Sequence, residues 1–416
     1  MKSLPFFLLA LIATAMPVRS ADSPSALAPA LQSFVEKGMA PGVVALVANK
    51  GGVLALEKAG YASLANKTLI REDAEFWIAS MSKSLTATAL MMLVDEGKVS
   101  LDDPVEKHLP EFKGQMVEET GVEMHPPLHP ITVREIMSHT SGLVLASEKT
   151  LKHTNSLKDD VLEYARHPLR QEPGTKYEYN NCGINTGGRI IEVVSGVSYA
   201  DFMQKRLFDP LGMKDTTCWP NEEQAGRLAH TARLTEDKKG LVEIKQDANV
   251  PLKAIEKLSE GVHVPAAITG EMGFGIAAEY AKHYAMPAGG YFSTANDLGR
   301  FCRMLLRDGE LDGKRYLSEK AVRMMSAPQL GDVKLSAQES YGIGWSLKLT
   351  DEEGPGAGSF GHRGARRTTM WIDPKNGLVM VLLVERFDMA GDQQKMIYGG
   401  FMKAAVENFG SSKAAR

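Results

Sequence analysis

Segments that look like β-strands occur near the two ends of this 416-residue chain, and this distribution restricts the folds it can adopt. At the N-terminal end, apolar, β-branched runs at residues 43–49 and 53–57 flank a Gly-Gly turn and predict a hairpin. At the C-terminal end, strand character returns at residues 341–347, 367–372 and 378–384. The simplest way to bury all of these runs is one antiparallel sheet to which both ends of the chain contribute.

Helical periodicity dominates the chain between these strands. Residues 80–96 carry apolar side chains at helical spacing, and Gly97 is a natural end for that helix. Further helices are predicted at residues 28–38, 132–138, 159–166, 185–195, 199–207, 294–308 and 393–409. We therefore predict an α+β fold: an antiparallel sheet from the N- and C-terminal segments, flanked by helices, with a mainly helical region inserted at about residues 100–290.

The first 20 residues have the pattern of a secretory signal peptide. Lys2 precedes an uncharged, apolar run over residues 4–18, and the residues near Ser20 suit cleavage there. This run is shorter than the roughly 18 residues that a membrane-spanning helix needs. We expect residues 1–20 to be removed and residues 21–416 to form the mature domain, periplasmic or secreted, with no integral membrane segment.

Charge and cysteine content argue against several classes of partner. The formal net charge is −3, so the chain has no excess of basic residues that would favour binding to nucleic acid. Three cysteines, Cys182, Cys218 and Cys302, show no spacing typical of zinc ligands, so neither a metal nor another cofactor is predicted. We interpret them as buried small residues, although the sequence also allows a disulfide between Cys182 and Cys218.

Residues 215–285 are polar and irregular, which is typical of a substrate lid or of a segment with its own structure.

One Ser-x-x-Lys motif, Ser80-Met81-Ser82-Lys83, opens the helix predicted at residues 80–96. Residues three apart lie on one helix face, so the lysine amine can reach the serine hydroxyl. A serine needs a base to become a nucleophile, and a lysine can be that base only if its pKa is lowered by burial or by nearby positive charge. We predict that Lys83 activates Ser80; otherwise Ser80 caps the helix and Lys83 points to solvent.

Two later motifs carry further candidate site residues. In Tyr179-Asn180-Asn181 the phenol could act as a base beside a cation, and the Asn181 amide could bind a substrate carbonyl or hold Lys83. The alternative is a turn before a helix. In residues 361–365, Gly-His-Arg-Gly-Ala, the glycines would let a substrate backbone approach, and the main-chain N–H of Ala365 could point into a site. The alternative is an irregular strand with a basic surface cluster.

The order of these three motifs resembles that in the serine β-lactamase and penicillin-binding protein superfamily. It is most similar to the class C β-lactamase-related group, which includes family VIII-type esterases and D-amino-acid peptidases. The resemblance covers about residues 30–400, with family landmarks at Phe76-Trp-Ile-Ala-Ser80, His139-Thr-Ser-Gly-Leu143, Gly289-Gly-Tyr-Phe-Ser293 and Tyr341-Gly-Ile-Gly-Trp345. It implies a β-lactamase/transpeptidase-like fold and a serine hydrolase, with residues 21–416 as the catalytic domain.

The resemblance also implies a role for each motif residue. Ser80 would be acylated, while Lys83 and Tyr179 would share its proton and return it to the leaving group. The main-chain N–H groups of Ser80 and Ala365 would form an oxyanion hole. Substrate binding would involve Asn181, His362, Arg363 and Gly364. His139 is predicted to be structural, bonding loops near the sheet.

Arg363 departs from the family pattern, which has a small residue at this position. An arginine here either blocks the subsite for a substrate carboxylate or supplies a bidentate clamp for it. We therefore predict hydrolysis of an ester or amide, as by a carboxylesterase or peptidase, on a small-molecule or peptide-like acyl substrate. A class C-like β-lactamase and a catalytically idle module that binds cell-wall peptide are the alternatives, and the oligomeric state is left open.

Overall fold

The structure is a computed structural model that describes residues 25, 27–144, 156–244, 284–351 and 354–410. The predicted signal peptide at residues 1–20 lies outside the described residues. So does the stretch 245–283, which makes up much of the region expected to be a lid or to have its own structure.

An eight-stranded sheet joins the two ends of the chain, as predicted. Its order is β10-β11-β12-β13-β14-β1-β2-β3, and all neighbouring strands are antiparallel. The two ends meet where β1 pairs with β14, which places Leu46 opposite Val381. The N-terminal strands are β1 (Gly42–Ala48), β2 (Val53–Ser63) and β3 (Thr68–Leu69). The C-terminal strands are β10 (Glu339–Tyr341), β11 (Ser346–Lys348), β12 (Phe360–Arg363), β13 (Thr369–Asp373) and β14 (Leu378–Val384).

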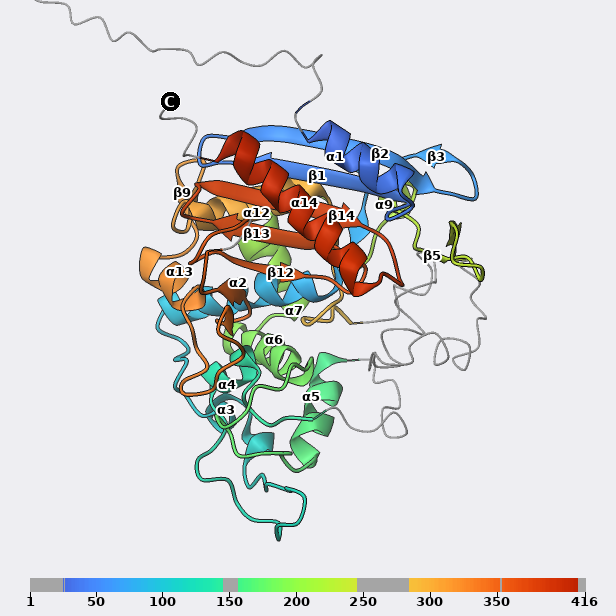
Figure 1. The fold of residues 1–416 in the computed structure, drawn as a ribbon. Helices are drawn as coiled ribbons and strands as arrows, with labels where there is room; N and C mark the ends of the chain where they lie inside the picture. The colour runs from blue at the N-terminus through green and yellow to red at the C-terminus, as the bar shows by residue number, and fades with distance from the viewer. Residues whose placement is uncertain (1–24, 26, 145–155, 245–283, 352–353, 411–416) are drawn as a thin grey trace, which may run out of the picture.

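Helices cover both faces of this sheet (Figure 1). Because side chains alternate along a strand, β1 contributes to two cores. Val44 and Leu46 join the core that contains the side chains of α2 and α12. Val43 and Val47 join the core beneath α1 and α14. The four covering helices are α1 (Ala28–Glu36), α2 (Ser82–Asp95), α12 (Ala295–Leu306) and α14 (Gly391–Phe409).

A mainly helical region lies on the α2 side of the sheet, in the lower half of Figure 1. Its helical elements are α3 (Val105–His108), η2 (Pro110–Phe112), α4 (Val133–Ser138), α5 (Leu157–Arg166), α6 (Cys182–Ser195), α7 (Tyr199–Met203), η3 (Gln204–Phe208) and α8 (Asp209–Leu211). The short helix α9 (Glu222–Ala225) lies apart from them, in the upper half of Figure 1. Three two-stranded pairs complete the structure: β4 (Phe76–Trp77) with β7 (Phe292–Ser293), β5 (Ala232–Leu234) with β6 (Leu241–Glu243), and β8 (Glu310–Leu311) with β9 (Lys314–Arg315).

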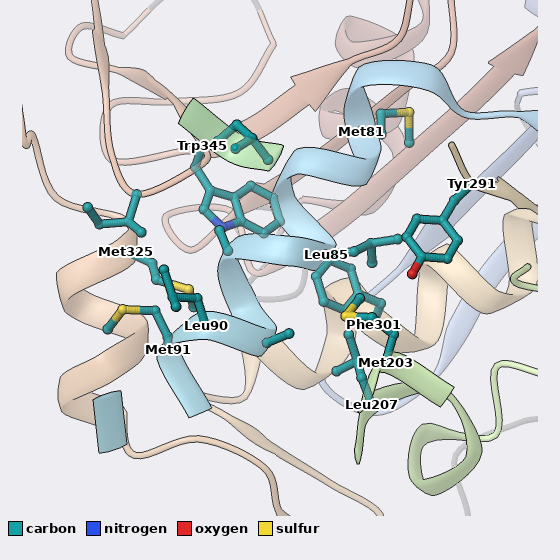
Figure 2. Packing of buried hydrophobic residues seen from close by; sticks show 14 of the residues in the cluster. Met81, Leu85, Leu90, Met91, Met203, Leu207, Tyr291, Phe301, Met325 and Trp345 are labelled. Carbon is teal, nitrogen blue, oxygen red and sulfur yellow. The ribbon is translucent and has the colours of Figure 1, made fainter. Parts of the chain in front are cut away.

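Helix α2 is buried on every side, from Ser82 to Leu93. Its apolar side chains contact Trp345, Phe301 and the residues around them (Figure 2). Helix α6 and the short helix α13 (Glu319–Met325) also pack against it. A helix enclosed in this way presents any polar side chain to the protein interior rather than to water.

Two predicted strands differ from the structure because of turns. Residues 341–347 form parts of β10 and β11 around a tight turn, in which the Gly342 N–H donates to the Trp345 carbonyl. Gly344 in that turn has φ 71° and lies so close to α2 that a Cβ would overlap the Cβ of Ala87. Strand β13 begins at Thr369, two residues later than the strand predicted at residues 367–372, because Arg367 adopts φ 77° in a turn.

The three cysteines are buried free thiols, so Cys182 and Cys218 are not bonded to each other. In the part of the chain that the structure describes, no helix combines the length and the apolar character needed to cross a bilayer.

The two-sided burial of β1 predicts a large effect of Leu46→Ala on stability. Leu46 is fully buried between β14 and the helices, so we expect the free energy of unfolding to fall by about 2–5 kcal/mol. Guanidinium denaturation of the purified protein measures this change. Leu69→Ala on β3 is the control, because Leu69 is 68% exposed and its truncation should cost less than about 0.5 kcal/mol. Equal losses for the two variants would contradict the burial described here.

Candidate active site

Ser80 lies in the 3-10 turn η1 (Ala79–Met81), which leads into α2. Ala79 has φ 46°, in the left-handed region that residues with a side chain rarely occupy, and this bend carries the chain from β4 into the helix. The Ile78 N–H donates to the Tyr291 carbonyl, which anchors the bend on the segment before β7. Ser80 is thereby held, half-buried, at the end of a buried helix.

The Lys83 amine contacts three oxygen acceptors from three parts of the chain. Its Nζ lies 3.1 Å from Ser80 Oγ, 2.8 Å from Asn181 Oδ1 and 2.7 Å from the Ala288 carbonyl oxygen. These contacts correspond to the three N–H bonds of a protonated amine. A neutral amine has two N–H bonds, and if the two carbonyl-type acceptors engage them, its lone pair is left for the Ser80 hydroxyl. The geometry therefore suits a proton transfer from Ser80 to Lys83.

Burial sets the protonation of Lys83. The side chain is fully buried on α2, and this burial lowers the pKa of its amine to about 7. Desolvation disfavours the charged form of a buried lysine, which is the physical cause of the shift. Both protonation states of Lys83 are therefore accessible near neutral pH.

Asn185 holds the carbonyl group that contacts Lys83. Its Oδ1 accepts the Ala288 N–H at 3.0 Å, while its Nδ2 donates to the Tyr164 hydroxyl at 3.1 Å. Sequence reasoning missed both Asn185 and Ala288. Asn185 lies one helical turn after Asn181 on α6, and that spacing is the one local signal that could have identified it.

Tyr179, which precedes α6, lies against Lys83. Its ring centroid is 4.9 Å from Lys83 Nζ and 4.5 Å from the ring of His139. The residue as a whole is 44% exposed, although its hydroxyl group is enclosed. The enclosed surroundings of the phenol raise its pKa above the ordinary value, and a hydrogen bond with Ser80 acts in the opposite direction. Tyr179 is therefore protonated at neutral pH.

The chain approaches the Ser80 turn at Gly364, directly after the end of β12. A Cβ at this position would lie 2.5 Å from the Ile78 carbonyl oxygen and would also overlap Thr368 Oγ1. The Thr368 hydroxyl itself bonds the same Ile78 carbonyl at 3.4 Å. The next residue, Ala365, is exposed, and its main-chain N–H has no hydrogen-bond partner among the described residues. Only a glycine fits between these two segments.

His362 and Arg363 point to opposite faces of β12. His362 is buried on the same side as Lys83, with its ring 6.2 Å from that of Tyr179. Arg363 turns toward α14, where its guanidinium lies 4.8 Å from the ring centroid of Tyr398. The structure thus groups His362 with Ser80, Lys83, Tyr179 and Asn181, whereas a substrate contact by Arg363 stays a prediction that requires its side chain to leave Tyr398. Among the described residues, no His, Cys, Asp and Glu side chains are grouped so as to hold a metal ion.

Comparison with known proteins gives consistent matches over most of the chain. A family model described as Beta-lactamase matches residues 28–400. An uncharacterized protein of Mycobacterium tuberculosis is 27% identical, with 89% of this chain and 92% of that protein covered. Penicillin-binding protein 4 of Amycolatopsis lactamdurans is 30% identical over 76% of this chain and 73% of its own length. The solved structure of EstCE1, described as a hydrolase with promiscuous acyltransferase activity, superposes with a TM-score of 0.71 at 21% identity, covering 90% of this chain and 97% of EstCE1.

The close approach at Gly364 predicts that Gly364→Ala damages both stability and the site. The added methyl group must push β12 away from Ile78, which should lower the free energy of unfolding by about 1–3 kcal/mol. Thermal unfolding and covalent labelling of Ser80 by a fluorophosphonate probe measure the two effects. Gly391→Ala is the control, since a Cβ at Gly391 meets no atom within 4 Å. If Gly364→Ala retained wild-type stability and labelling, the contact between β12 and η1 would not matter for the site.

Proposed function

The chain belongs to the beta-lactamase family, and from that premise we propose that it is a serine hydrolase acting through an acyl-Ser80 intermediate. One observation carries the proposal: a buried lysine amine, with its pKa lowered to about 7, lies 3.1 Å from the Ser80 hydroxyl. A neutral amine at this distance can accept the proton that a serine must lose to become a nucleophile.

The acylation step follows from these contacts. Ser80 Oγ forms a bond to the substrate carbonyl carbon as its proton passes to Lys83 Nζ. The carbonyl oxygen becomes an oxyanion, for which the main-chain N–H groups of Ser80 and Ala365 are the proposed donors. The bond to the leaving group then breaks, and the leaving group receives a proton from the pair of Lys83 and Tyr179. Water attacks the acyl-Ser80 ester in the second half of the reaction and releases the acid.

The pKa shifts favour different roles for the two proton carriers. Burial lowers the pKa of Lys83 toward neutrality but raises that of the Tyr179 phenol. At neutral pH Lys83 can therefore accept a proton, whereas Tyr179 carries one. We assign the role of base to Lys83 and the role of proton donor to Tyr179, which takes up a proton from Lys83 as it gives its own to the leaving group.

We propose an ester or a small amide as the substrate rather than a β-lactam. β-Lactam antibiotics carry a carboxylate, and neither candidate residue on β12 supports its recognition. His362 is buried with its pKa lowered to about 3, so it is uncharged, and the Arg363 guanidinium lies over Tyr398. Parallel assays with p-nitrophenyl esters, D-amino-acid amides and nitrocefin compare the three classes. Turnover of nitrocefin above that of the esters would reverse this choice of substrate.

We also propose that the mature enzyme works outside the cytoplasm, in the periplasm or as a secreted protein. The support is the signal-peptide pattern of residues 1–20. A catalytically idle binding module remains the alternative to the enzyme, and the joint presence of Ser80, Lys83 and Tyr179 favours the enzyme.

Ser80→Ala should abolish covalent labelling by a fluorophosphonate probe, because it removes the hydroxyl oxygen that Lys83 is placed to activate. Intact-mass spectrometry of the treated protein measures the adduct. Ser82→Ala is the matched control: Ser82 lies two residues away, but its hydroxyl accepts the Tyr291 N–H and is not among the hydrogen-bond partners of Lys83 in the described part of the chain. Continued labelling of Ser80→Ala, or loss of labelling in Ser82→Ala alone, would overturn the assignment of the nucleophile.

The lowered pKa of Lys83 predicts an acid limb in the rate. Above pH 7 the amine is mainly neutral and can act as a base, whereas below pH 7 it is protonated and cannot. For a neutral ester we expect kcat/KM to fall by about tenfold per pH unit below this pKa. The measurement runs from pH 5 to pH 9, and activity regained on return to pH 8 shows that acid has not unfolded the enzyme. A flat profile would remove Lys83 as the base.

A further inference from the structure

Three side chains that the proposed mechanism does not use form a buried contact between the helical region and the sheet. His139 ends α4 in a left-handed conformation, Tyr341 lies on β10 and His362 on β12. The Tyr341 hydroxyl lies 3.2 Å from His139 Nε2 and 3.1 Å from His362 Nε2. One phenol therefore bridges two imidazoles.

The two ends of this bridge fix its direction. At one end the Asn180 main-chain N–H contacts His139 Nδ1 at 3.4 Å. At the other end His362 Nδ1 lies 2.9 Å from the Arg363 carbonyl oxygen. A main-chain N–H can only donate and a carbonyl can only accept. His139 must then carry its proton on Nε2, and His362 must carry its proton on Nδ1.

One consistent set of hydrogen bonds follows from these ends. His139 Nε2–H donates to the Tyr341 oxygen, and the Tyr341 hydroxyl donates to His362 Nε2. Each of the three groups donates once and accepts once, so the chain is complete only when both imidazoles are neutral. A proton added to His362 would turn its Nε2 into a donor and leave the Tyr341 hydroxyl without its acceptor.

This chain of hydrogen bonds connects the two segments that bear the proposed catalytic groups. Asn180 lies between Tyr179 and Asn181, and the His139 carbonyl also accepts the Glu178 N–H at 2.8 Å. At the other end, Arg363 is the last residue of β12 and directly precedes Gly364 and Ala365, in the turn that approaches Ser80. A shift of Tyr341 would therefore move the Tyr179 loop relative to β12.

The neutral state also suits the charge that develops at Lys83. The charged or titratable groups facing the two imidazoles are Lys83 from α2, Tyr177 and Tyr179 from the loop before α6, Tyr341 from β10, and Arg363 beside His362. Burial and the charge of Lys83 lower the pKa of both histidines. When Lys83 takes the proton of Ser80, no imidazolium lies beside it to oppose the new positive charge.

We propose that Tyr341 is a positioning residue of this site: through one directed chain of hydrogen bonds from Asn180 to Arg363, it holds the Tyr179 loop and β12 in place around Lys83. The inference rests on the proposed function, because the groups that it positions are the proposed catalytic ones. Tyr341 does not touch the reacting atoms in this scheme.

Tyr341→Phe tests the proposal with little change in volume. We expect kcat for a neutral p-nitrophenyl ester to fall by about tenfold to a hundredfold, because misplaced catalytic groups act mainly on the chemical step, while KM changes less than about threefold. Tyr177→Phe is the matched control: Tyr177 packs against the rings of His139 and Tyr341, yet its hydroxyl forms no hydrogen bond within the described part of the chain. An unchanged kcat in Tyr341→Phe, or an equal loss in Tyr177→Phe, would overturn the proposal.

A second measurement separates this inference from the proposed function. In protein labelled with 15N-histidine, NMR should show His362 as the Nδ1–H tautomer and His139 as the Nε2–H tautomer at pH 7, with assignment by His→Gln variants. In Tyr341→Phe the pKa of His362 should rise, because the hydrogen bond to its neutral form is lost. The opposite tautomers in the wild type would refute the proposed chain of hydrogen bonds, even if Tyr341→Phe does not fold. If the expected tautomers are found but the wild type neither turns over nor labels, the proposed function fails while the chain itself stands.

Discussion

The site depends on one physical constraint, the burial of the Lys83 amine inside the protein. A charged group removed from water is costly unless it is paired or fully hydrogen-bonded. Here the acceptors are Ser80 in η1, Asn181 at the N-cap of α6, and the Ala288 carbonyl in the segment before β7. All three acceptors reach the amine only when these three parts of the chain are assembled around α2, so the site depends on the packing of the helical region against the sheet.

Close packing of backbone determines how the sheet meets this buried helix. Gly344 and Gly364 stand where the β10–β11 and β12–β13 turns reach α2 and η1, and a side chain at either position would collide with the helical segment. Because the contact at Gly364 is made by main-chain atoms of Ile78, flexible side chains cannot relieve it. The position of Ala365 relative to Ser80 is therefore set by this packing together with the hydrogen bond from Thr368 to the Ile78 carbonyl.

The alternation of side chains along β12 decides the electrostatic character of the site. His362 joins Lys83 and Tyr179, whereas the charge of Arg363 is carried to the α14 face and lies over Tyr398. With His362 held neutral by burial, Lys83 supplies positive charge beside Ser80 when its amine is protonated. This separation supports the proposal of an uncharged substrate, and it allows the Tyr341 bridge to remain a chain of hydrogen bonds between neutral groups.

The sequence by itself determined the features that depend on local pattern. Apolar periodicity located the main strands and helices, and the one-turn spacing of Ser80 and Lys83 placed amine and hydroxyl on one face. Other features needed the tertiary structure. The Ala288 carbonyl oxygen accepts a hydrogen bond from Lys83, 205 residues away in the sequence. Because every residue has a main-chain carbonyl, no sequence motif identifies this one. The face to which Arg363 turns and the bridge by Tyr341 were also hidden, because both follow from strand register and from contacts between distant segments rather than from neighbouring residues.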